Sequence, residues 1–175
     1  MHPHPLQEIQ QILIKSAHDL ISLERPNYQF IAARLLLFAI QKQVFNTKWK
    51  DSTIYPPLYE IIQRNIEKGV YDKDILDQYT KEEIEKCNVF VKHARDLTFT
   101  YAGLQQIVDK YLVQDRSTAE VYETPQFMYV LIAMTLFQNY DKEVRLDYVK
   151  RYYDAISQFK INIPTPIMAG VRTPL

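Results

Sequence analysis

The residues best suited to chemistry lie near the C-terminal end of the chain. Thr165 stands between two prolines, and Gly170 and Arg172 follow within a few residues. A hydroxyl, a cation and backbone amides in a flexible segment can together hold an anionic ligand. The alternating residues 161–163 predict a short strand that ends before Thr165, because proline cannot continue a regular sheet. The pattern therefore predicts an anion site at a strand end, with a disordered tail as the alternative.

The other reactive side chains form no recognisable catalytic group. Cys87 is the single cysteine, which excludes a disulfide framework, a redox pair and a cysteine-based metal cluster. The carboxylates fall on helix faces without the facing partner that a general acid and base need. We therefore expect no catalytic residue and no metal ligand. The histidines, which lack the helical spacing of metal ligands, are His2, His4, His18 and His93.

Composition excludes several classes of protein. The 175 residues carry 21 basic and 21 acidic side chains, which gives no basic field for nucleic acid. Only three glycines are present, and no Walker or dinucleotide motif occurs. The N-terminus lacks signal-peptide features, and the longest apolar run, residues 127–137, is too short to cross a bilayer. We expect a cytoplasmic protein with one core and with no nucleic-acid or membrane partner.

The first part of the chain predicts two helices. Residues 6–23 place apolar side chains at helical spacing, and a second helix begins at a cap formed by Asn27. Arg34 interrupts the apolar face of this second helix, and we expect it to form an ion pair. A polar connecting loop with Trp49 is predicted at residues 46–55. The inward stripe of the second helix is expected to comprise Phe30, Ile31, Leu35, Phe38 and Ala39.

Start and stop signals divide the middle of the chain. Gly69 is the expected C-cap of a helix over residues 58–68. Thr80 and Glu83 form a capping box that starts another helix. A small antiparallel hairpin is predicted within residues 111–122. Further helices are predicted at residues 73–78 and 102–110.

Two longer helices complete the prediction. Thr124 as N-cap and Pro125 at the first helical position open a helix that is hydrophobic nearly all round. We expect this helix, residues 126–137, to be the buried centre of the domain. Asp141 is the predicted cap of the last helix. Its inward stripe is expected to comprise Val144, Tyr148, Val149, Tyr152, Ile156 and Phe159. Its solvent face is expected to carry Lys142, Arg145, Lys150 and Arg151.

Residues 148–174 resemble the start of the catalytic barrel in the large subunit of class I ribonucleotide reductase. They read YVKRYYDAISQFKINIPTPIMAGVRTP. Three upstream segments are similar to the helical domain that precedes the barrel in this family, and they occur in the same order. These segments are RDLTFTY at 95–101, KYLVQ at 110–114 and ETPQF at 123–127.

The resemblance implies a mainly α-helical fold with one small β-hairpin, divided into three parts. Residues 1–45 would be a remnant of the ATP-cone helices with a linker helix, 46–159 the helical N-terminal domain, and 160–175 the first strand and start of the catalytic α/β barrel. The cone's phosphate signature, Val-x-Lys-Arg-x-Gly, does not occur. We therefore expect no working nucleotide site here. Lys42, which falls where cone-bearing relatives have a lysine near the nucleotide, is expected at the surface.

The resemblance also implies a function. Large subunits of this family reduce ribonucleoside diphosphates to deoxyribonucleotides with a cysteine radical and a redox cysteine pair in the barrel. A radical-generating small subunit and nucleoside triphosphate effectors take part. Thr165 matches the barrel threonine that binds the substrate phosphates. The barrel cysteines would lie beyond residue 174, so we expect this chain to contribute to reduction only when the remaining large-subunit polypeptide completes it.

A second function stays open at this point. The chain is also compatible with a stand-alone helical interaction module that binds a reductase subunit, another protein or a second copy of itself, without catalysis. An apolar strand at residues 161–163 without neighbours would suit either function, because unpaired strand edges associate with other chains.

Overall fold

The computed structural model describes residues 5–45 and 55–174, and in these residues the fold is mainly helical with one two-stranded sheet. The predicted fold class is therefore confirmed. The loop predicted around Trp49 lies outside the described residues, except for its last residue. The helices and strands are α1 (Pro5–Asp19), α2 (Tyr28–Phe45), α3 (Leu58–Glu67), α4 (Asp74–Gln78), α5 (Lys81–Phe90), the 3-10 helix η1 (His93–Thr98), α6 (Tyr101–Lys110), β1 (Gln114–Asp115), β2 (Glu120–Val121), α7 (Pro125–Phe137), α8 (Arg145–Ser157) and α9 (Thr165–Gly170).

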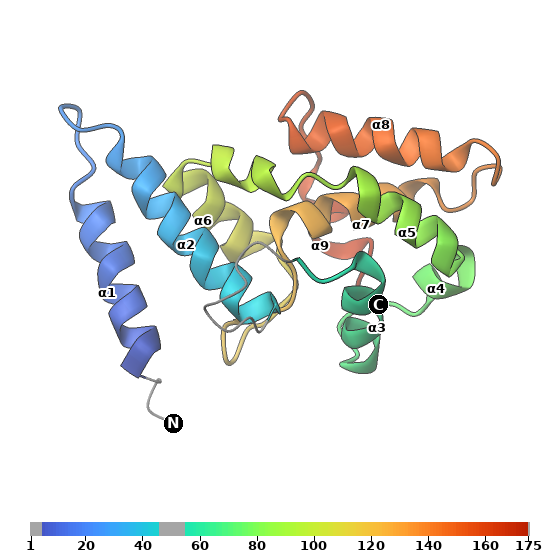
Figure 1. Ribbon diagram of the computed structural model, residues 1–175, viewed down its shortest axis with the longest axis horizontal. Helices are drawn as coiled ribbons and strands as arrows, with labels where there is room; N and C mark the ends of the chain where they lie inside the picture. Colours follow the sequence, from blue (N-terminus) through green and yellow to red (C-terminus); the bar gives the residue numbers. More distant parts are fainter. Residues whose placement is uncertain (1–4, 46–54, 175) are drawn as a thin grey trace.

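Helix α7 lies at the centre of the molecule. It packs against α8, η1 and α9, and Figure 1 shows it between the α1–α2 pair at one end and α4 and α5 at the other. Thr124 caps it by accepting a hydrogen bond from the amide of Phe127, and Pro125 occupies the first turn. The first ten of its 13 residues are buried. The all-round apolar sequence thus predicted the core helix correctly, because no face was left for water.

Helices α1 and α2 pack against each other, and α2 also packs against α6. The predicted inward face of α2 is wrong, since Phe30 and Ile31 are 36% and 47% exposed. Helix α2 is apolar on most sides, so its neighbours rather than its own periodicity select the buried face. Arg34 is exposed and forms no ion pair within the described residues. The buried side chains of α2 are Ala32, Ala33, Leu37, Ile40 and Val44.

The capping signals at the end of α3 and at the start of α5 are confirmed. Gly69 follows α3 with a φ of +71°, a conformation that favours glycine. Thr80 and Glu83 form the capping box of α5: each side chain accepts a hydrogen bond from the other residue's amide, both at 3.2 Å. The hairpin is confirmed as well, with Gln114 opposite Val121 in an antiparallel pair.

Helix α8 differs from its prediction at the N-terminal end. The chain turns after Asp141, and the helix begins at Arg145. Arg145 was expected in solvent but is only 2% exposed, whereas Val144, expected inside, is 45% exposed. The cause is an ion pair between Arg145 and Glu83 that draws the guanidinium into the interior.

The predicted strand near the C-terminal end is wrong. Residues 161–164 have no regular structure, and the chain then forms helix α9. The two prolines explain the difference: Pro164 is extended at the N-cap, and Pro166 occupies the first turn, where its fixed φ favours a helix. Gly170 belongs to α9 and is not a flexible point. None of the helices in the described parts of the chain is long and apolar enough to cross a membrane.

Candidate functional site

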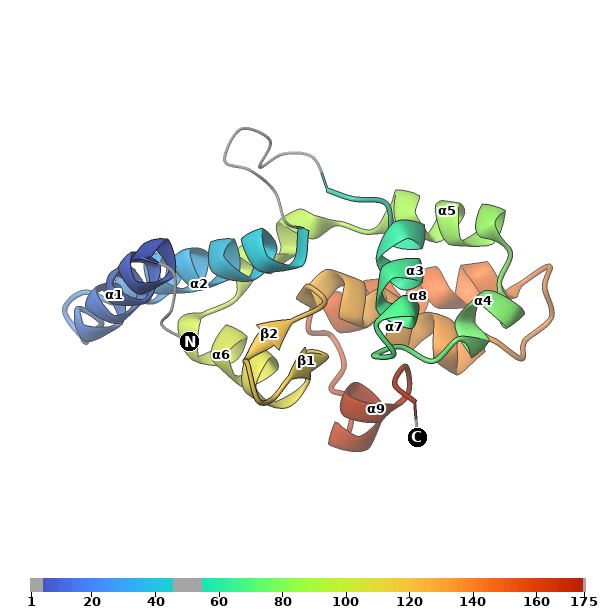
Figure 2. The ribbon, with the colours of Figure 1, turned by 90° about the horizontal axis from the view of Figure 1, so that it is seen from below.

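The first turn of α9 presents the predicted binding residue. Thr165 is exposed, and its Oγ1 lies 3.3 Å from the hydroxyl of Tyr111, which follows α6. Figure 2 shows α9 below α7, on the side where α6 and the hairpin lie. The structure therefore places Thr165 at the surface, in a helical turn instead of at the predicted strand end.

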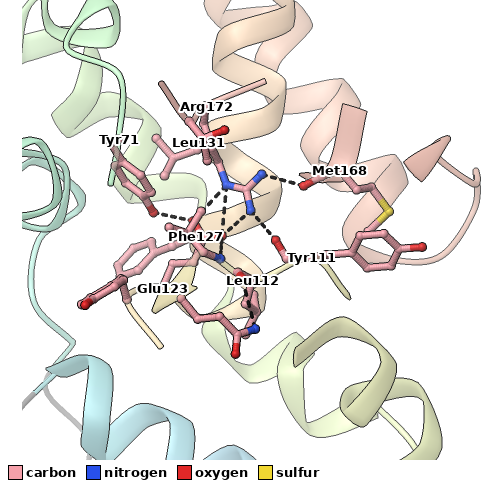
Figure 3. A network of polar contacts seen from close by, with 12 residues as sticks. Tyr71, Tyr111, Leu112, Glu123, Phe127, Leu131, Met168 and Arg172 are labelled. Atoms are coloured by element: carbon pink, nitrogen blue, oxygen red, sulfur yellow. Dashed lines mark hydrogen bonds and ion pairs between the residues drawn. The ribbon is translucent and has the colours of Figure 1, made fainter. Parts of the chain in front are cut away.

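Arg172 anchors the segment that follows α9. Its Nε lies 3.0 Å from each carboxylate oxygen of Glu123. Its Nη1 donates to the carbonyl of Met168 at 2.6 Å, and its Nη2 donates to the carbonyl of Tyr111 at 2.8 Å (Figure 3). The predicted role of Arg172 in anion binding is wrong, because the guanidinium is buried and its donors are occupied by protein groups.

The side chain of Glu123, which forms an ion pair with this guanidinium, is fully buried. The carboxylate also accepts hydrogen bonds from the amide of Val113, at 2.9 Å, and from the hydroxyl of Tyr71. The hairpin brings Val113 and Glu123 together, because its two strands are antiparallel and Tyr122 donates its amide to the carbonyl of Val113. A buried carboxylate with a cation and two further donors is fully satisfied.

The protonation states in this network follow from burial and charge. Burial raises the pKa of Tyr71 well above its usual value, and the nearby Glu123 carboxylate raises it further. Burial lowers the pKa of Arg172, but attraction to Glu123 outweighs this and leaves the pKa raised. Tyr71 is therefore a neutral donor and Arg172 a fixed cation, so the network keeps its hydrogen bonds across the physiological pH range.

A second contact ties the end of the chain to the turn between α3 and α4. The amide of Asp72 donates to the carbonyl of Arg172 at 3.0 Å. Asn65 supports the same turn, because its carbonyl accepts from the amides of Val70 and Tyr71 and its side chain donates to the carbonyl of Tyr122. The C-terminal segment is thus joined to three parts of the molecule.

A cleft of about 510 Å³ lies beside α9. Among the described residues its lining is uncharged and mostly apolar, so it suits neutral chemical groups better than ions. Phe159, at its edge, has a φ of +57°. Tyr111 and Met168 border both this cleft and the Arg172 network. The other residues that line it are Thr98, Phe99, Thr100, Gly103, Gln106, Ile107, Tyr129, Ile156, Ile161, Asn162 and Ile163.

Burial shifts the pKa values of Cys87, His93 and Asp96 toward their neutral forms. Burial raises the pKa of the Cys87 thiol to about 12, which removes its nucleophilic character at neutral pH. Burial lowers the pKa of His93 to about 4. Burial also raises the pKa of Asp96 to about 7, against the opposing effect of a hydrogen bond from Gln126. Within residues 5–45 and 55–174, no group of three or more histidine, cysteine or acidic side chains is placed to hold a metal ion.

Sequence reasoning missed the Arg172–Glu123–Tyr71 network. Glu123 lies 49 residues before Arg172, and no local pattern connects them. The available signals were a carboxylate directly before a helix cap and an arginine between Val171 and Thr173. Neither signal identifies its partner without the fold.

Comparisons with known proteins agree with the helical fold. The family model described as "Ribonucleotide reductase, all-alpha domain" matches residues 97–175. Ribonucleoside-diphosphate reductase 1 subunit alpha is 50% identical over 168 residues in Salmonella typhimurium and 49% identical over 168 residues in Escherichia coli. The phage T4 subunit alpha is 44% identical over 167 residues.

Each of these matches covers 95% of this chain but only 21% of the relative. The chain therefore spans about one fifth of the length of the curated relatives it matches, and the match lies in their N-terminal region. The resemblance drawn from the sequence motifs is thereby confirmed. This chain belongs to the family of ribonucleotide reductase large subunits and contains their all-alpha domain.

Proposed function

We propose that this chain contributes to the reduction of ribonucleoside diphosphates to deoxyribonucleotides as the N-terminal helical part of a reductase large subunit. The observation that carries the proposal is the 50% identity to a named subunit alpha, which extends over 95% of the chain. The barrel chemistry belongs to the remaining large-subunit polypeptide. No described residue of this chain is assigned a catalytic role.

Within this function, Thr165 binds the substrate phosphates. Its hydroxyl is exposed, and a second hydroxyl, that of Tyr111, lies 3.3 Å away. Two adjacent hydroxyls can donate to an anion without bringing a competing negative charge. The segment that carries Thr165 is fixed at its other end by Arg172, which favours a defined binding geometry.

The partners follow from the same proposal. They are the remaining large-subunit polypeptide, a radical-generating small subunit and the diphosphate substrate, with nucleoside triphosphates as effectors bound elsewhere in the subunit. We also propose the cytoplasmic location and the division at residues 45 and 159. Helix α2, which lies in the first proposed part, nevertheless contacts the second part, residues 46–159. Gln43 accepts a hydrogen bond from the amide of Val121.

A chimera tests this function. The matching region of the Escherichia coli subunit alpha is replaced by this chain, and deoxynucleotide formation is measured with the E. coli small subunit. We expect an active chimera with a modestly changed KM. A folded chimera that binds no diphosphate would contradict the proposal. Binding of the separate chain to the parent subunit, together with an inactive chimera, would instead support the interaction module.

A further inference from the structure

The guanidinium of Arg172 contacts Tyr111 and the helix that carries Thr165. Its Nη1 donates to the carbonyl of Met168 in α9, the helix that begins at Thr165. Its Nη2 donates to the carbonyl of Tyr111, whose hydroxyl lies beside Thr165. One buried cation therefore fixes the backbone at Met168 in α9 and at Tyr111 (Figure 3).

We propose that Arg172 is a positioning residue for the phosphate-binding group, and that Glu123 and Tyr71 hold it in the required orientation. This inference rests on the proposed role of Thr165. Arg172 does not touch the substrate. It sets the distance between the two hydroxyls, and thereby how well they fit a phosphate oxygen.

The chemistry of the network explains why this position carries an arginine. A planar guanidinium can donate in several directions at once, whereas the ammonium of lysine is a compact charge that cannot span the same acceptors. Glu123 is itself oriented by the amide of Val113 and the hydroxyl of Tyr71. A buried ion pair gives no more stability than a well-packed apolar pair of similar volume. What this ion pair adds is orientation.

The molecule contains a matched control. Arg145 is also buried, at 2% exposure, and pairs with the carboxylate of Glu83. It donates to the carbonyls of Gln78 and Gln138, at 2.7 and 3.0 Å. None of these partners belongs to α9 or to the residues around Tyr111. Arginine-to-lysine substitution at this position disturbs the same kind of network without reaching the phosphate-binding group.

The test compares Arg172→Lys, Tyr71→Phe and Arg145→Lys in the chimera, with Tm, kcat and KM for a ribonucleoside diphosphate measured below the lowest Tm. Arg172→Lys should raise KM about tenfold with kcat nearly unchanged, the pattern expected when binding geometry alone is lost. Tyr71→Phe should raise KM less, because Glu123 keeps its other donors. Arg145→Lys should lower Tm and leave KM at the parent value.

A second readout uses the chain as it stands. Amide hydrogen exchange in residues 165–171 should accelerate in Arg172→Lys and stay unchanged in Arg145→Lys, because Arg172 contacts α9 and Arg145 does not. An active chimera with an unchanged KM in Arg172→Lys, or with equal KM changes in both lysine variants, overturns the positioning role alone. If the chimera without any of these substitutions binds no diphosphate, the proposed function is overturned. The positioning role of Arg172 is then overturned as well, whatever hydrogen exchange shows.

Discussion

At the scale of single residues, two buried carboxylates illustrate how the environment decides chemistry. Glu123 forms an ion pair with Arg172 and belongs to a hydrogen-bonded network. Asp96 has no cation beside it: Gln126 donates to its Oδ1 at 2.8 Å, and its Oδ2 has no hydrogen-bond partner in the described parts of the chain. Desolvation therefore acts on Asp96 without compensation by an opposite charge, and its pKa rises to about 7.

Asp96 should make stability depend on pH. A carboxyl group with a raised pKa binds its proton more tightly in the folded state, so its unfavourable effect appears as pH rises from about 4, the unfolded pKa, to about 7. Asp96→Asn removes this effect. The variant should gain stability relative to the parent across this window, on the order of 4 kcal/mol in total. Urea unfolding at pH 4.5 and pH 8, values chosen roughly to bracket the window, measures the difference.

Three neighbours must be considered in this comparison. Tyr129 and Tyr153 face Asp96 with raised pKa values and stay neutral throughout the window. His93, whose pKa is lowered to about 4, makes stability rise with pH and therefore opposes Asp96 in the parent. The opposing effect is present in both proteins and cancels in their difference. A difference that does not change with pH would show that Asp96 is ionised in the folded state.

Thr165 supplies the second prediction at this scale. Thr165→Ala in the chimera should weaken diphosphate binding by about 1.5–3 kcal/mol, the value of a hydrogen bond to a charged group. Thr165→Ser keeps the hydroxyl and should bind nearly as well as the parent. Calorimetric titration with a ribonucleoside diphosphate measures both. Equal losses in the two variants would assign the effect to the missing methyl group or to altered packing of α9.

At the scale of helices and strands, predictability follows the range of the interactions. The caps at Thr80, Gly69 and Thr124 were predictable, because each depends on atoms within a few residues. The buried face of α2 was not, because an apolar helix gives no preferred side and its neighbours decide. The helix beginning at Thr165 was mistaken for a strand end, because a proline fits both the first turn of a helix and the end of a strand.

In the candidate site, too, local features could be predicted from the sequence and long-range contacts could not. Thr165 was identified as a candidate from a local pattern, a hydroxyl between two prolines. The position of Arg172 was not predictable, because its carboxylate partner, Glu123, comes from a hairpin 49 residues earlier and only the packing of α9 on α7 brings them together. Arg145 was assigned to solvent for the same reason, since Glu83 lies 62 residues before it.

The capping box of α5 allows a test at this scale. Thr80→Ala removes the side-chain acceptor for the amide of Glu83 and should lower the free energy of unfolding by about 1 kcal/mol. Thr80→Ser preserves the acceptor and should cost much less. The measurement is urea unfolding at neutral pH. If the serine variant lost as much stability as the alanine variant, the hydroxyl would not be the source of the effect.

At the scale of the whole molecule, the C-terminal segment is part of the core. Met168 and Arg172 are buried, and Arg172 is joined to the α6 end, the hairpin and the α3–α4 turn. The sequence had suggested a strand that projects from a finished helical domain and waits for a partner. The structure instead closes the domain with this segment, so residues 161–174 support the fold as well as the proposed site.

Removal of the segment should therefore destabilise the helical domain. A chain that ends at residue 160 retains Glu123 without the cation that compensates its burial, and breaking a buried ion pair in this way costs about 3–5 kcal/mol.

The test measures urea unfolding of the full chain and the shortened chain, each with and without Glu123→Gln. In the full chain the substitution should destabilise, because it leaves Arg172 unpaired. In the shortened chain it should stabilise, because it removes an unpaired charge. This reversal of sign separates the ion pair from the loss of apolar packing around Met168, which Glu123→Gln does not alter. Equal destabilisation by Glu123→Gln in the two chains would mean that the carboxylate stabilises the domain through Val113 and Tyr71, and that Arg172 is not its essential partner.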